Sequence, residues 1–321
     1  MTRPSSVPPP VTAVLDASSR WLPTRLAEVE QLLREAIGGH GEILGGDAAA
    51  TLAAGGKRLR PMLVLLTAGP ERSAGAVSAA AAIELVHMAT LVHDDVLDDA
   101  PLRRGLPTIA ATSGRDRAVA AGDLLFSRAF ALLAENGDER AVALLAEASV
   151  ALARGELAQR HDAFDMEVGE ERYLRRCRLK TARLFECACL LGHDDERLRE
   201  FGGGVGLAFQ LLDDVLDVSG PPERTGKARG TDLLDGTVTL PLIEAAESDP
   251  GIRQVDLRTL GANEAEALCE RIAATGALER VGSRALALVA AAKEALERTD
   301  LGAEQRQLLA LVADGVVQRY S

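Results

Sequence analysis

Apolar residues recur every three to four positions along most of the chain, beginning at about Asp16. This spacing is typical of amphipathic helices, and Ala, Leu, Glu and Arg, which favour helices, are frequent in the same segments. Gly, Pro or Asp separates most of these segments and indicates where each helix ends. The pattern predicts helices over residues 23–38, 58–69, 75–99, 115–135, 139–163, 168–191, 195–218, 237–247, 263–275, 279–298 and 302–318.

Signals for β-strands are nearly absent, so the predicted fold class is all-α. Several of the helical segments, such as Ala79 to Val92, are apolar on most of their circumference. Helices of this kind are buried inside a bundle rather than laid on its surface. We therefore expect one large helical domain over residues 13–321, preceded by a disordered Pro-rich tail over residues 1–12.

Charge and composition exclude several classes of function. The 321 residues include 36 Lys and Arg against 48 Asp and Glu, a net charge of −12, and only 3% are aromatic, so we expect no nucleic-acid partner. No apolar run reaches the roughly 18 residues of a membrane span, and the first twelve residues lack a signal-peptide core. A cytoplasmic protein is the expectation. The four cysteines, in neither zinc-binding nor disulfide-rich spacing, should be reduced and mostly buried.

The pattern Asp-Asp-x-x-Asp occurs twice, at Asp94, Asp95 and Asp98 and again at Asp213, Asp214 and Asp217. In a helix the three carboxylates of each copy lie within an arc of roughly 100° on one face. Like charges one turn apart destabilise a helix, so two such faces beside apolar residues need a reason other than folding. A divalent cation supplies it, because Mg²⁺ prefers carboxylate oxygens and shares its coordination with substrate phosphates.

Cations that could hold phosphate lie elsewhere in the chain. Lys57 and Arg60 fall in the first turn of a predicted helix, where free backbone N–H groups also favour anions. Arg103 and Arg104 follow the first acidic motif, where they could also neutralise the end of a helix. His87 lies on the same side of the helix as Asp94, two turns away.

Taken together, these motifs resemble the trans (E-type) polyprenyl diphosphate synthase family. The resemblance rests on GGKRLRP (55–61), ELVHMATLVHDDVLDDAPLRRGLPT (84–108), LKTARLF (179–185), LAFQLLDDVLDV (207–218), GKARGTDLLDG (226–236) and TLP (239–241), in the order found in the family. It implies a helical bundle of the isoprenoid synthase type, usually homodimeric, with an acidic motif on each of two opposed walls of a central cavity. One departure is Thr237, where the family often has Lys.

The resemblance also implies the chemistry. A Mg²⁺-dependent prenyltransferase would condense isopentenyl diphosphate with an allylic prenyl diphosphate to an all-trans polyprenyl diphosphate. Asp94, Asp98 and Asp213 are then the strongest candidate Mg²⁺ ligands, and Asp95, Asp214 and Asp217 complete or orient the cluster. The side chains expected at the allylic diphosphate are Arg103, Lys180 and Lys227, those at isopentenyl diphosphate are Lys57, Arg60, His87 and Arg104, and those facing the carbocation are Thr181 and Gln210.

Product length in similar synthases depends on the residues four and five places before the first acidic motif. Here these are Ala89 and Thr90, with Val86 one turn deeper, and none is bulky. The expected product is therefore hexaprenyl or longer, delivered at most peripherally to a membrane. The alternatives are a geranylgeranyl or farnesyl diphosphate synthase, a regulatory subunit of a two-component synthase, and a class I terpene cyclase.

Overall fold

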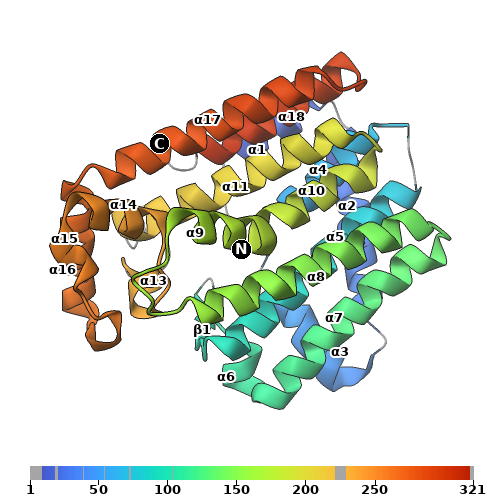
Figure 1. Cartoon of the computed structure of the whole chain (residues 1–321). Helices are drawn as coiled ribbons and strands as arrows, with labels where there is room; N and C mark the ends of the chain where they lie inside the picture. The colour runs from blue at the N-terminus through green and yellow to red at the C-terminus, as the bar shows by residue number, and fades with distance from the viewer. Residues whose placement is uncertain are drawn as a thin grey trace. The chain divides into compact units, whose positions relative to one another are not determined.

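The computed structural model describes residues 9–18, 21–38, 40–53, 55–71, 74–103, 105–220 and 229–318. Helices form nearly all of the regular structure in these ranges, so the all-α prediction is confirmed (Figure 1). The strands described there are two residues long, β1 (Leu102–Arg103) and β2 (Leu106–Pro107), and they pair as an antiparallel hairpin.

The chain divides into two compact units. Unit 1 comprises residues 1–149, 187–199 and 299–315, and unit 2 comprises residues 150–186, 200–298 and 316–321. The prediction of one domain over residues 13–321 stays a prediction.

Unit 1 is built around helix α5, which packs against α7, α4 and α2. Helices α3 and α6 pack against α7 in turn, as Figure 1 shows. The helices that lie in this unit, wholly or for most of their length, are α1 (Pro9–Ala17), α2 (Trp21–Ile37), α3 (Gly41–Ala53), α4 (Leu59–Ala68), α5 (Ala74–Leu97), α6 (Ile109–Ser113), α7 (Arg115–Glu135) and α18 (Ala303–Gln318).

In unit 2, helix α14 packs against α9 and α17, and α16 packs against α17 and α13. A π-helical turn, Arg178–Ala182, joins α9 to α10. The remaining elements are α8 (Glu139–His161), α9 (Glu170–Cys177), α10 (Arg183–Gly192), α11 (Glu196–Ser219), α13 (Thr231–Leu234), α14 (Leu240–Ser248), α15 (Pro250–Arg253), a 3₁₀ turn (Leu257–Thr259), α16 (Ala262–Ala274) and α17 (Ala277–Glu297), of which α8, α10 and α11 are shared with unit 1.

Most helix boundaries lie within three residues of the predicted ones, and the four cysteines are free and buried, as expected. The predicted disordered tail over residues 1–12 is too long at its C-terminal end, because α1 begins at Pro9. Proline is tolerated in the first turn of a helix. Residues 1–8 lie outside the described residues. Helix α3 was not predicted, since Gly41, Gly45 and Gly46 weaken its helix propensity, and its contacts with α7 and α2 offset that weakness.

Helix α5 is unusually apolar. Contrary to the expectation from the sequence, its segment Gly75–Leu97 is long and apolar enough to cross a membrane, with a mean hydropathy of 1.6. However, 72% of an 18-residue window in this segment is buried inside the protein. The core helix of a globular unit meets the same criteria of length and composition, so this hydropathy accords with its central place in unit 1.

The start of α4 depends on a buried group of charges. Arg58, the residue before the helix, has a φ of 49°, which is uncommon for a residue with a side chain. Its guanidinium donates to Glu84 of α5 at 2.8 Å and also pairs with Glu30 of α2. Although burial disfavours the charge, these carboxylates raise the pKa of Arg58 above its usual value. The two ion pairs therefore hold the backbone in this conformation.

We predict that Glu84→Ala lowers the free energy of unfolding by about 3 kcal/mol, because it leaves a buried guanidinium with too little compensating charge. The side chains of Arg58 and Glu84 are 12% and 5% exposed. Glu30→Ala is the matched control and should cost less than about 1 kcal/mol, since Glu30 is 32% exposed. Denaturant unfolding measures both variants, and equal losses would contradict a special role for Glu84.

Candidate active site

The first acidic motif forms the last turn of α5 and the residue after it. Asp95 is buried and accepts a hydrogen bond from Nε of Arg103, on the hairpin, at 2.6 Å. Asp94 is half-buried and Asp98 is exposed. Because Arg103 neutralises the middle carboxylate, the motif carries less repulsive charge, and the other two carboxylates are presented one helical turn apart.

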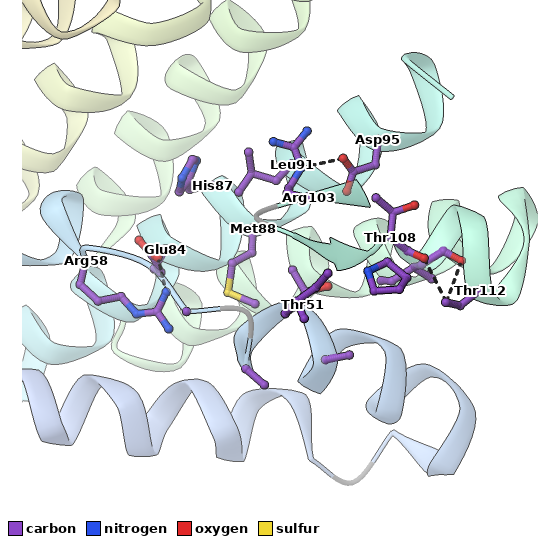
Figure 2. A pocket seen from close by; sticks show the side chains of 16 residues that line it. Thr51, Arg58, Glu84, His87, Met88, Leu91, Asp95, Arg103, Thr108 and Thr112 are labelled. Atoms are coloured by element: carbon purple, nitrogen blue, oxygen red, sulfur yellow. Dashed lines mark hydrogen bonds and ion pairs between the residues drawn. The ribbon is translucent and has the colours of Figure 1, made fainter. Parts of the chain in front are cut away.

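A cavity of about 390 Å³ opens beside this turn, entirely within unit 1 (Figure 2). It is lined by α3, the segment before α4, α5, the hairpin and α6. His87, Asp95 and Arg103 all contribute to its wall, so three predicted site residues do come together here. Arg58 and Glu84 also line it and were not predicted.

The cations predicted to bind diphosphate differ in where the structure places them. Lys57 is exposed and Arg60 half-buried, and neither is among the residues that line this cavity. Arg104 lies outside the described residues, as does Lys227 in unit 2. The partition of these cations between two substrates therefore stays a prediction.

Of the three residues proposed to limit product length, Ala89 and Val86 are fully buried. Thr90 is half-buried, and its hydroxyl donates to the backbone carbonyl of His87 at 2.7 Å. Thr90 is thus the one of the three whose side chain is not fully buried.

The second acidic motif lies near the end of α11 in unit 2. Asp213 is exposed and Asp217 half-buried, whereas Asp214 is only 3% exposed. The Tyr173 hydroxyl of α9 donates to one oxygen of Asp214 at 2.5 Å, and the Gln210 amide donates to the other at 2.8 Å. As in the first motif, the middle carboxylate is held by neighbouring side chains and the outer two are more accessible.

A chain of hydrogen bonds extends from this carboxylate. The Thr181 hydroxyl, in the π-helical turn, donates to the side-chain oxygen Oε1 of Gln210 at 2.7 Å. The predicted pair of Thr181 and Gln210 is therefore in contact. Burial, followed in size by repulsion from the charge of Asp232, raises the pKa of Asp214 to about 8, although the hydrogen bonds from Tyr173 and Gln210 favour its ionised form. The network therefore fixes the orientation of a carboxyl group that resists ionisation.

Lys180 precedes Thr181 in the same π-helical turn and points to a different helix. Its ammonium group forms an ion pair with Glu156 of α8. Single π-helical turns inside longer helices are frequent at functional sites. The turn thus presents a cation on one side and a hydroxyl on the other.

Three residues in these contacts were not predicted from the sequence. Tyr173 and Glu156 touch predicted residues directly, and the Asp232 backbone N–H donates to Asp217 at 3.1 Å. A signal existed for Glu156, because Gly155 precedes it inside a helical pattern, and an isolated glycine there often marks a close approach. Tyr173 carried no comparable signal.

The donor chemistry of the two motifs fits a divalent metal ion. Among the described residues, no three Asp, Glu, His or Cys side chains are grouped closely enough to hold a metal by themselves. Mg²⁺, however, is commonly bound by one or two carboxylates together with substrate phosphates. Asp94 with Asp98 and Asp213 with Asp217 offer such carboxylates, while the contacts of Asp95 and Asp214 suit orienting roles.

The model of the polyprenyl synthetase family matches residues 43–275. Component 2 of heptaprenyl diphosphate synthase from Geobacillus stearothermophilus is 43% identical over 245 residues, covering 73% of this chain and 77% of that protein. Geranylfarnesyl diphosphate synthase from Aeropyrum pernix is 36% identical, covering 86% of this chain and 94% of that protein.

Among solved structures, a polyprenyl synthase from Caulobacter crescentus CB15, complexed with calcium and isoprenyl diphosphate, superposes with a TM-score of 0.89. It is 34% identical and the match covers 99% of this chain and 100% of that one. The fold is thus the helical fold of isoprenoid synthases, and the family acts with a divalent metal ion. The chain belongs to the polyprenyl synthetase family and is a trans-prenyltransferase.

Proposed function

We propose that this chain condenses isopentenyl diphosphate with an allylic prenyl diphosphate in a Mg²⁺-dependent reaction. The observation that carries the proposal is the shared design of the two acidic motifs. In each, a neighbouring side chain holds the middle carboxylate, Arg103 for Asp95 and Tyr173 for Asp214, and the outer carboxylates are more exposed. Calcium and isoprenyl diphosphate in the Caulobacter structure support a metal-bridged diphosphate.

The proposed reaction needs no nucleophile from the protein. The bond between the allylic carbon and its diphosphate oxygen breaks, and the electron pair leaves with the diphosphate. The double bond of isopentenyl diphosphate then attacks the allylic cation and forms the new carbon–carbon bond. A proton is lost from the adduct to restore a double bond, and the released diphosphate is well placed to accept it.

Acidic residues would hold the metal, and basic residues would bind the diphosphates. Asp94, Asp98 and Asp213, with Asp217, would hold Mg²⁺, which when bound stabilises the negative charge on the departing diphosphate. Lys180, Arg103 and Lys227 would bind the allylic diphosphate, and Lys57, Arg60, His87 and Arg104 the isopentenyl diphosphate. Thr181 and Gln210 would direct oxygen lone pairs towards the cation.

The class of enzyme is tested by assaying the purified chain alone with Mg²⁺. We expect elongated all-trans products, and we expect Asp94→Asn or Asp213→Asn to lower turnover by roughly 100-fold or more, because charge stabilisation is the main catalytic device. The matched control is Asp99→Asn, an exposed residue with a φ of 49°, which asparagine tolerates. Cyclised hydrocarbon products would instead indicate a terpene cyclase.

We propose a product longer than geranylgeranyl diphosphate, in line with the heptaprenyl and geranylfarnesyl synthases among the relatives. The support from the structure is that Thr90, about one helical turn before Asp94, has a small and only half-buried side chain. Hexaprenyl or longer products remain our expectation within that range.

Thr90→Tyr should shorten the product by at least one isoprene unit, because an aromatic ring would occupy the space that the growing chain enters. Thr90→Val, which keeps the volume of the side chain, should leave the product distribution unchanged. Mass analysis of the products with excess isopentenyl diphosphate measures both. We prefer Thr90 to the buried Ala89 for this test, because a large residue at Ala89 would overpack the core.

We propose that the active form is a homodimer. The alternative is assembly with a different subunit, since one relative is named component 2 of its synthase. Light scattering of the purified chain should give twice the chain mass of 33.8 kDa, with activity in the same fraction. A monomer without activity would favour a second subunit. The cytosolic location and peripheral delivery of product to a membrane stay predictions from the sequence.

A further inference from the structure

The contact between Glu156 and Lys180 has no part in the chemistry described above. Lys180 lies in the π-helical turn between α9 and α10, and Glu156 lies on α8, with side chains 27% and 15% exposed. Arg160, one turn further along α8, donates from Nε to the other oxygen of Glu156 at 2.9 Å. Glu156 therefore bridges two cations.

The backbone is built to bring these groups together. A Cβ atom on Gly155 would lie 2.5 Å from the backbone nitrogen of Lys180 and 2.8 Å from its Cα, so only glycine permits this approach of α8. On the other side of the turn, a Cβ atom on Gly206 of α11 would lie 2.8 Å from the Cα of Ala182. The π-helical turn is thus held between two helices at glycine contacts, and its position is closely determined.

The charges of the contact are well defined. Burial disfavours ionisation of Glu156, but Lys180 and Arg160 outweigh that cost and lower the pKa of the carboxyl below its usual value. Glu156 is therefore ionised at neutral pH. An ammonium group has three N–H donors, so a lysine that gives one to a fixed carboxylate keeps two for another anion.

We propose that Glu156 is a positioning residue for the allylic diphosphate. It fixes the ammonium group of Lys180 in one orientation, so that the two remaining N–H donors point to where the diphosphate binds. Arg160 keeps the carboxylate in place when part of the lysine charge is shared with the substrate. This inference rests on the proposed function, in which Lys180 meets the allylic diphosphate.

Orientation and charge act in opposite directions here. A carboxylate near a diphosphate repels it, so removing Glu156 would by charge alone tighten the binding of the allylic substrate. If orientation dominates, the same change weakens binding, because a free lysine side chain loses rotamer entropy when it is fixed by the ligand. The sign of the effect therefore distinguishes the two roles.

The experiment is a double-mutant cycle on the full chain with both substrates. We expect Glu156→Ala to raise the Michaelis constant for the allylic diphosphate roughly 10-fold, and that for isopentenyl diphosphate less than about twofold. Glu156→Gln keeps an acceptor oxygen and should recover most of the loss. In a Lys180→Ala background, Glu156→Ala should have little further effect, because the cation that it positions is gone.

Glu147→Ala, at an exposed glutamate of the same helix, is the matched control and should leave both Michaelis constants unchanged. A lower allylic Michaelis constant in Glu156→Ala would overturn the proposal, as would equal effects on both substrates or full additivity with Lys180→Ala. Calorimetric binding of inorganic diphosphate with Mg²⁺ gives a second measurement. If the wild type makes no prenyl product, the proposed function fails, whereas diphosphate binding that is unaffected by Glu156→Ala refutes this inference alone.

Discussion

Repulsion between carboxylates one helical turn apart is the constraint that the local structure around both acidic motifs resolves. Each motif concentrates three acidic side chains on one helix face, which destabilises the helix in the absence of a cation. In unit 1 the solution is an ion pair, because Arg103 reaches back from the hairpin to Asp95. In unit 2 it is burial with hydrogen bonds, because Tyr173 and Gln210 hold Asp214. In both motifs, two different local structures thus leave the outer carboxylates more exposed than the middle one.

Two cations of the structure, like the middle carboxylates, are held by neighbouring side chains. Arg58 and Lys180 do not stand as isolated charges, since each pairs with a glutamate on a neighbouring helix. Such pairs cost little net free energy when they form, but each restricts a long side chain to one orientation. For an enzyme that handles diphosphates, orientation before binding reduces the entropy lost on binding. The ion pair of Lys180 therefore connects the packing of the helices to the proposed recognition of substrate.

Close helix contacts at glycine determine where Lys180 and Thr181 lie. Gly155 and Gly206 allow α8 and α11 to approach the π-helical turn from two sides. A larger residue at either position would move the turn, and Lys180 and Thr181 would move with it. The structural role of these glycines is thus to set distances between backbones, which then fix the contacts of the side chains.

The sequence by itself determined the all-α class, most helix boundaries and the two acidic motifs, because apolar spacing and motif spacing are local properties of the chain. It also indicated Lys180, Thr181 and Gln210, through resemblance to a family. The roles of Tyr173 and Glu156 and the ion pairs of Arg58 were decided by tertiary structure. Each of these contacts joins residues from different elements that are at least 24 positions apart in the sequence, the smallest separation being that of Glu156 and Lys180. No periodic pattern encodes such a contact, since it depends on how closely two backbones approach.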